Sequence, residues 1–229
     1  MTEKSRIILA LDYPDMDRTR VMIEKTREDI SIYKLGLEFF TAQGRQGVFQ
    51  IQREFSEIEI FLDLKLHDIP NTVQGACRSV AELAPRFLTV HAAGGYEMVH
   101  AAATALPATE ITAVTVLTSL DAGELAAMNL PNDPELLACG LAKRAVEAGA
   151  RAIVCSPHEV TILREILGAS VCLITPGVRP TASLSDDQKR TMSPREAIAA
   201  GSDFVVIGRP ITQATDPREA VSQILGSMA

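Results

Sequence analysis

The sequence has no tryptophan, and aromatic residues make up only 4% of its 229 positions. Proteins that bind nucleic acids usually combine a basic surface with aromatic side chains on which bases stack. Here the formal net charge is −7, so the balance is acidic. The composition therefore argues against a nucleic-acid-binding or other interaction module, and against a partner at an anionic membrane surface.

No run of 18 or more apolar residues occurs, so no membrane span is expected. The apolar run at 7–11 is too short for a signal peptide and ends in Asp12. The four cysteines, Cys77, Cys139, Cys155 and Cys172, form no CxxC motif and no metal-ligand spacing. They are typical of small buried residues in a reducing compartment, so we expect a cytoplasmic protein without a metal site.

Eight short apolar runs recur along the chain. Most are continuously apolar rather than alternating, as in strands that are buried on both faces of a parallel sheet. They span residues 7–12, 32–36, 58–65, 87–92, 111–117, 152–155, 171–175 and 204–208.

Segments with helical periodicity separate these runs, for example at 73–83 and 137–148. A further helix start is predicted at 193–196, because Ser193 can cap it, Pro194 fits its first turn and Glu196 completes a capping box. Alternating strands and helices predict an α/β fold, a single (β/α)8 TIM barrel domain over residues 1–229. The alternative is an open doubly wound sheet, but no GxGxxG motif follows the first run.

The active site of such a barrel lies where its strands end, and the first three strands carry or end in charges. These residues are Asp12, Lys34, Asp63, Lys65 and Asp68. Strand alternation predicts that Asp63 and Lys65 share a face. Charges in this position are costly to desolvate unless they are paired, which indicates an ion-pair network at the barrel mouth.

The seventh and eighth strands end in a different pattern, Pro176-Gly177-Val178-Arg179 and Gly208-Arg209. Glycines let main-chain N–H groups approach an anion, and the loops after these two strands are the usual phosphate site of such barrels. Arg179 and Arg209 would add charge-assisted contacts. The irregular stretch from Gly177 to about Thr191 has the length of a functional lid.

The segment 63–72, Asp-Leu-Lys-Leu-His-Asp-Ile-Pro-Asn-Thr, resembles the DxKxxDIPNT signature of the orotidine 5′-phosphate decarboxylase family. Six further segments resemble the family in its own order, at 9–12, 33–36, 115–119, 175–180, 187–190 and 206–211. The resemblance covers most of the chain and is to the short bacterial form. It implies decarboxylation of orotidine 5′-monophosphate to UMP, the last step of de novo UMP biosynthesis, without a metal or cofactor.

The resemblance also assigns roles. Lys65 would protonate the pyrimidine carbon C6, and Asp63 would lie against the departing carboxylate. Asp12 and Lys34 would hold the ribose hydroxyls and complete the catalytic array of charges. Asp68 and Thr72 would reach across a homodimer interface into the partner's site. The remaining substrate contacts would come from Thr118, Ser119 and Pro176 near the base and from Arg179, Gln188, Gly208 and Arg209 at the phosphate.

The proposed chemistry needs such residues. Loss of carbon dioxide leaves an electron pair on a ring carbon that has no ready electron sink, so a cation and a proton are needed there at once. A lysine ammonium supplies both, and flanking carboxylates favour its charged form. Placed charge can then replace a cofactor. Repulsion between Asp63 and the substrate carboxylate would be a further contribution.

Two alternative functions and one alternative role for a residue pair are compatible with the sequence. A magnesium-dependent sugar-phosphate decarboxylase or aldolase of the same superfamily would hold its metal with an acidic residue on the second strand, where this chain has Lys34. A non-catalytic phosphate-ligand barrel would have lost at least one of Lys34, Asp63, Lys65 and Asp68, all of which are present. Thr118-Ser119 could instead cap a helix. His67 and His91 are assigned no role.

Overall fold

The computed structural model describes residues 5–179 and 192–228. Its eight strands are all parallel and close into a barrel in the order β1 to β8, with β1 paired to β8. The (β/α)8 prediction is therefore confirmed, and each predicted strand is present with its ends shifted by at most three residues. The strands are β1 (Ile7–Leu11), β2 (Ile32–Gly36), β3 (Glu59–Leu66), β4 (Phe87–His91), β5 (Glu110–Val114), β6 (Ala152–Val154), β7 (Cys172–Thr175) and β8 (Phe204–Ile207).

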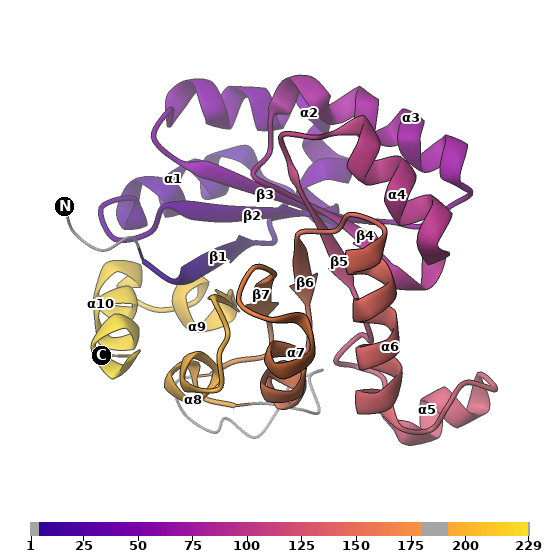
Figure 1. Cartoon of the computed structure of the whole chain (residues 1–229). Helices are drawn as coiled ribbons and strands as arrows, with labels where there is room; N and C mark the ends of the chain where they lie inside the picture. Colours follow the sequence, from indigo (N-terminus) through magenta and orange to yellow (C-terminus); the bar gives the residue numbers. More distant parts are fainter. Residues whose placement is uncertain (1–4, 180–191, 229) are drawn as a thin grey trace.

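Helices surround the barrel in the described part of the chain (Figure 1). They are α1 (Met16–Thr26), α2 (Leu37–Glu54), α3 (Pro70–Val80), α4 (Gly95–Ala105), α5 (Ala122–Ala127), α6 (Pro134–Glu147), α7 (Val160–Leu167), α8 (Pro194–Ala199), α9 (Arg209–Thr212) and α10 (Pro217–Met228). Three 3-10 turns lie at η1 (Ala81–Leu83), η2 (Ala92–Gly94) and η3 (Pro157–Glu159).

The start of α8 follows the sequence prediction in detail. The amide of Glu196 donates to the Ser193 hydroxyl, and the Glu196 carboxylate accepts from the Ser193 amide at 2.9 Å. Two of the amides that a helix start leaves unpaired are thereby satisfied. Thr118-Ser119 has no such role, because Asp121 caps α5 through the amide of Glu124.

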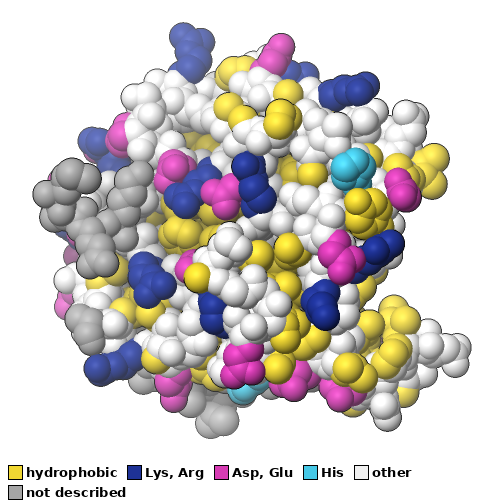
Figure 2. Space-filling model, viewed as in Figure 1, with side chains coloured by type: hydrophobic (Ala, Val, Ile, Leu, Met, Phe, Trp, Pro, Cys, Tyr) yellow, Lys and Arg dark blue, Asp and Glu magenta, His cyan; other side chains and the backbone are white. Residues whose placement is uncertain are grey.

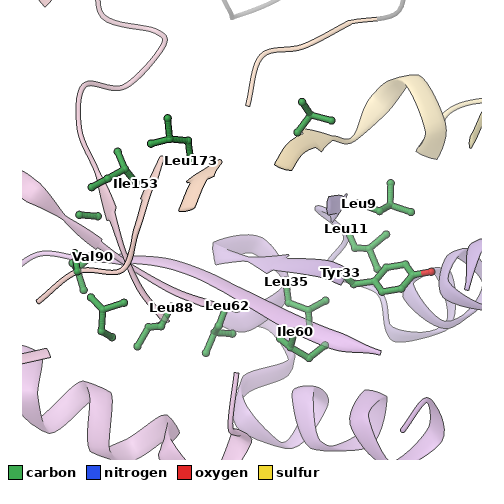
Figure 3. Packing of buried hydrophobic residues seen from close by; sticks show 14 of the residues in the cluster. Leu9, Leu11, Tyr33, Leu35, Ile60, Leu62, Leu88, Val90, Ile153 and Leu173 are labelled. Atoms are coloured by element: carbon green, nitrogen blue, oxygen red, sulfur yellow. The ribbon is translucent and has the colours of Figure 1, made fainter. Parts of the chain in front are cut away.

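The strands bury both faces, and each face has its own hydrophobic layer. Outward-facing residues such as Leu62, Leu88 and Val90 pack in the large cluster between the sheet and the helices (Figure 3). Inward-facing residues form a second cluster inside the barrel: Ile8, Ile32, Phe61, Phe87, Ala152 and Ile174. Since side chains alternate along a strand, the next inward residues lie one layer closer to the barrel mouth. On β1 and β2 these are Ala10 and Lys34.

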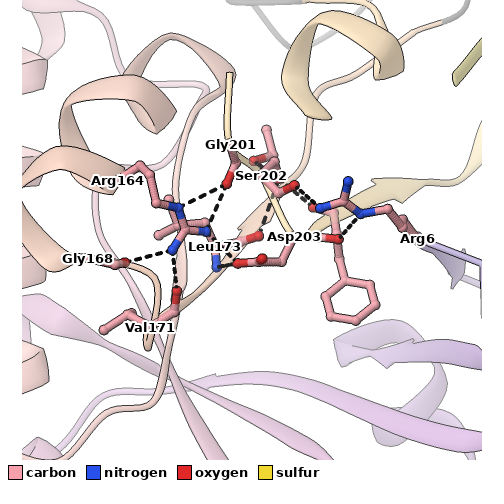
Figure 4. A network of polar contacts seen from close by, with 10 residues as sticks. Arg6, Arg164, Gly168, Val171, Leu173, Gly201, Ser202 and Asp203 are labelled. Carbon is pink, nitrogen blue, oxygen red and sulfur yellow. Dashed lines mark hydrogen bonds and ion pairs between the residues drawn. The ribbon is translucent and has the colours of Figure 1, made fainter. Parts of the chain in front are cut away.

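A network of polar contacts ties the opposite end of the barrel together (Figure 4). The Arg164 guanidinium on α7 donates to the carbonyl oxygens of Gly168, Val171 and Gly201. It also donates to the Asp203 carboxylate at 2.6 Å, and that carboxylate accepts the amide of Leu173. The network therefore joins α7, β7 and β8 at the end of the barrel away from the strand-end charges.

The surface shows acidic and basic side chains interspersed, with no single large basic patch on the face drawn in Figure 2. Helix α5 projects from the barrel (Figure 1). Among the described residues, none of the helices combines the length and the apolar character that a membrane span requires.

Candidate active site

A cavity of about 300 Å³ opens at the carboxyl ends of the strands. Its floor includes Phe61, Val154 and Val206, which belong to or pack against the inner hydrophobic cluster. The polar and glycine residues of its wall come from both halves of the chain: Asp12, Lys34, Asp63, Lys65, Thr118, Gly177, Arg179, Gly208 and Arg209. The barrel therefore brings four of the five predicted charged residues, all except Asp68, and the predicted Gly-Arg pairs into one cavity.

Four side chains form a continuous row of alternating charge, here called the charge array: Asp12, Lys34, Asp63 and Lys65. Lys34 Nζ lies 2.9 Å from Asp12 Oδ1 and 3.4 Å from Asp63 Oδ2. Lys65 Nζ lies 2.8 Å from both oxygens of Asp63. Each inner member thus has an opposite charge on either side, which is what allows it to remain charged while largely buried.

This arrangement shifts the pKa values of the two inner members, Lys34 and Asp63. Burial lowers the pKa of Lys34, but the carboxylates of Asp63 and Asp12 outweigh it, so the pKa lies above its ordinary value. Burial raises the pKa of Asp63, but the two neighbouring ammonium groups and a hydroxyl outweigh it, so that pKa lies below its ordinary value. Both groups are therefore charged across the neutral pH range.

Asp63 and Lys65 meet as predicted, but β3 is not a regular strand at this point. Its register with β4 shifts between Leu62 and Leu66. Lys65 has a φ of 47°, in the left-handed region that non-glycine residues rarely adopt, at a cost of roughly 1–2 kcal/mol. Its amide donates to the hydroxyl of Thr89 on β4 at 2.8 Å. Strand alternation therefore predicts that Asp63 and Lys65 are neighbours, but it does not predict the irregular backbone that the structure has between Leu62 and Leu66.

The opposite wall comes from the ends of β7 and β8. Pro176, Gly177 and Arg179 line the cavity beside Gly208 and Arg209. Gly177 has a φ of 79°, which glycine adopts without strain. A Cβ at position 208 would lie 3.4 Å from that of Ala10, so the two ends of the chain approach closely here.

Other predicted residues lie elsewhere. Asp68 and Thr72 are exposed and do not line the cavity of their own chain. The Asp68 carboxylate accepts the amide of Ile69, whose side chain is 66% exposed. Ser119 is next to the lining residue Thr118 but does not line the cavity itself. Gln188, like most of the predicted 177–191 loop, lies outside the described residues.

Two features near the array were not assigned from the sequence. Thr89 is fully buried and donates to Asp63 Oδ1 at 2.9 Å. The rings of His67 and His91 lie 5.3 Å apart, and burial, together with His67 and Lys65, lowers the pKa of His91. A threonine in an apolar strand is a weak signal, because β-branched residues are common in strands for packing reasons alone.

No group of three or more His, Cys, Asp or Glu side chains is arranged to hold a metal ion within the described ranges. Two acids of the charge array do converge, but Lys34 lies between them, within 3.4 Å of each.

Comparisons with known proteins identify a family. The family model for the orotidine 5′-phosphate decarboxylase / HUMPS family matches residues 5–224. An orotidine 5′-phosphate decarboxylase of Thermobifida fusca is 50% identical over 222 residues, which cover 97% of this chain and 95% of the relative. One from an Anaeromyxobacter species is 46% identical over the full length of both chains.

The structural comparison points the same way. The crystal structure of orotidine 5′-phosphate decarboxylase from Lactobacillus acidophilus matches with a TM-score of 0.84 at 34% sequence identity, and the match covers 97% of this chain and 98% of that one. With the barrel, the cavity and the full-length relatives in agreement, this chain belongs to the orotidine 5′-phosphate decarboxylase / HUMPS family.

Proposed function

We propose that this chain, a carboxy-lyase by its family, converts orotidine 5′-monophosphate to UMP in pyrimidine biosynthesis, with no metal or cofactor. The observation that carries the proposal is the pairing, in one cavity, of a charge array with a Gly-Arg wall suited to a phosphate. The volume of about 300 Å³ lies at the small end of the range for ligand pockets, which matches a mononucleotide.

Lys65 is the proposed proton donor to C6. Its ammonium is held by both oxygens of Asp63, so it is oriented before the substrate arrives. The same Asp63 carboxylate would lie against the substrate carboxylate and disfavour it in the ground state. As carbon dioxide leaves, the ammonium would stabilise the carbanion and then transfer a proton to it.

The remaining contacts divide along the cavity. Asp12 and Lys34 would bind the ribose hydroxyls, and Thr118, with Ser119 and Pro176 nearby, would contact the base. Arg179, Gly208 and Arg209, with Gln188, would bind the phosphate. Binding energy from the phosphate, far from the reacting carbon, would order the site around the pyrimidine.

Asp68 and Thr72 are proposed to act in the site of a second subunit. Both are exposed, and the apolar Ile69 between them is exposed as well, as expected for residues that a partner chain covers. Mixing two inactive variants, Lys65→Ala and Asp68→Ala, should restore activity, because a heterodimer contains one site with both residues intact. Random exchange would recover about one quarter of the wild-type activity. No recovery from a mixture proven to exchange subunits would refute the shared site.

The direct test is to add orotidine 5′-monophosphate and follow the absorbance change on conversion to UMP. A folded protein without turnover would overturn the proposal. Lys65→Ala should abolish turnover and still bind UMP, whereas Lys143→Ala, on the exposed face of α6, should match the wild type. A Lys65→Ala variant that kept its rate would exclude the proton-donor role.

Metal independence has its own test. The ammonium of Lys34 lies 2.9 Å from Asp12 and 3.4 Å from Asp63, and would repel a divalent cation from these acids. Activity should therefore survive exhaustive treatment with EDTA. Loss of activity that magnesium restores would instead favour a metal-dependent sugar-phosphate enzyme of the same superfamily.

A further inference from the structure

Thr89 occupies the centre of β4, between Leu88 and Val90, and is fully buried. Both neighbours belong to the cluster between sheet and helices (Figure 3), so Thr89 faces the barrel interior. Its hydroxyl makes two contacts there. It donates to Asp63 Oδ1 at 2.9 Å and accepts the amide of Lys65 at 2.8 Å.

These contacts coincide with the irregularity of β3. In the β3–β4 ladder Leu62 pairs with Leu88 and Leu66 pairs with Val90, so four steps along β3 face two along β4. Lys65 lies in this interval without a paired residue in β4, and its amide donates to the Thr89 side chain. The hydroxyl therefore provides an acceptor for the lysine amide at the point where the ladder is interrupted.

The same hydroxyl fixes the orientation of the Asp63 carboxylate. Thr89 donates to Oδ1, and Lys34 lies on the side of Oδ2, at 3.4 Å. Rotation of the carboxylate would break one of these contacts. A hydroxyl has a single hydrogen, and here it is directed at Asp63, which leaves the oxygen lone pairs for the Lys65 amide.

We propose that Thr89 is a positioning residue for decarboxylation, which sets the Asp63 carboxylate and the Lys65 ammonium in their working geometry through one shared hydroxyl. This inference rests on the function proposed above. Thr89 does not line the cavity and touches no reacting atom in this mechanism. Its effect is transmitted through the two residues that it contacts.

Thr112 on β5 provides a matched control. It is the register partner of Thr89 in the β4–β5 ladder, it is equally buried, and it does not line the cavity. Its hydroxyl donates to the main-chain oxygen of Glu110 and not to the charge array. A purely structural hydroxyl at position 89 would therefore behave like the one at position 112 when each is replaced by the isosteric valine.

Steady-state kinetics should distinguish a positioning role of the Thr89 hydroxyl from a purely structural one. Thr89→Val should lower kcat about 100-fold, the effect expected when catalytic groups are misplaced by about 1 Å, and change KM less than about threefold because the phosphate wall is untouched. Thr112→Val should keep kcat within about threefold of the wild type. Equal kcat values for the two valine variants would overturn the proposal.

Thr89→Ser keeps the hydroxyl and loses only a methyl group, so it should restore kcat to within about threefold of the wild type. A folded serine variant with kcat reduced more than about tenfold would refute the proposal, whether or not Thr89→Val yields soluble protein.

A measurement without turnover separates this inference from the proposed function. The Lys65 amide should exchange with deuterium at least about tenfold faster in Thr89→Val than in the wild type, relative to the amides of β2. Unchanged exchange would show that Thr89 does not hold Lys65 and would overturn the inference. A wild-type protein that fails to turn over orotidine 5′-monophosphate would refute the proposed function alone.

Discussion

Replacing Lys34 by methionine should lower the free energy of unfolding by about 3–5 kcal/mol, because it removes one partner from a buried ion pair. The side chains of Lys34 and Asp63 are 12% and 11% exposed, and their charges are 3.4 Å apart. At an effective dielectric constant of 20 such a pair attracts by about 5 kcal/mol. Asp12 adds a second attraction to Lys34. Two effects reduce the loss of stability: the methionine has no charge to desolvate, and Asp63 keeps its contact with Lys65.

Urea denaturation at pH 7 measures the effect, and thermal unfolding should show a melting temperature lower by about 6–20 °C. Arg20→Met is the control. Its salt bridge to Glu54 is shorter, at 2.7 Å, but lies at the surface with both side chains at least one-third exposed. It should cost less than about 1 kcal/mol. Equal losses of stability in the two variants would show that burial does not increase the contribution of the Lys34–Asp63 ion pair.

The pH dependence supplies a second check on Lys34→Met. The pKa of Asp63 is lower in the folded protein than in the unfolded chain, where it is about 4. Ionised Asp63 therefore stabilises the fold at pH values above the unfolded pKa. This stabilisation is lost as the pH falls through the folded pKa. Without Lys34 that pKa rises toward the unfolded one. Wild type and variant should therefore differ most near neutral pH and converge in acid. A difference that grew as the pH fell below about 4 would contradict this account.

Two further predictions concern packing near and far from the cavity. In Gly36→Ala the new Cβ would lie 2.9 Å from Asp12 Oδ1, so kcat/KM should fall at least about tenfold while folding is retained. Gly226→Ala on α10, with nothing within 4 Å of the new Cβ, should have normal kinetics. Equal kinetics for the two variants would exclude the steric explanation. Arg164→Met should destabilise the protein by about 2–4 kcal/mol in urea, because the Asp203 carboxylate and three main-chain oxygens lose their donor, and kcat should be unchanged. A stable variant with impaired kcat would contradict that separation.

Much of this architecture could be read from the sequence because it is encoded locally. Continuous apolar runs mark strands buried on both faces, and a charge at the end of such a run stands out. A charge inside such a run stands out in the same way, as Lys34 and Asp63 do. The Ser193–Glu196 capping box can also be predicted from the sequence, because all of its partners lie within four residues.

Contacts that depend on the register between strands could not be predicted from the sequence. The contact between Thr89 and Asp63 arises from the shifted pairing of β3 with β4, and no pattern within either strand encodes that shift. The positive φ of Lys65 cannot be predicted from the sequence either, because lysine has no preference for that conformation. Asp68 does not line the cavity of its own chain, so neither the local sequence pattern nor the single subunit assigns it a role.

The pairing of β1 with β8 has a consequence for how the protein is made. Ile8 pairs with Val206, so the barrel closes only after nearly the whole chain is available. Contacts so distant in sequence form slowly, because a long loop must close before they become favourable. A nascent chain lacking β8 would expose the unpaired edges of β1 and β7, which are potential sites of aggregation. Asp12 and Arg209 face the same cavity only after this step. Catalytic competence should therefore appear late in folding, together with barrel closure.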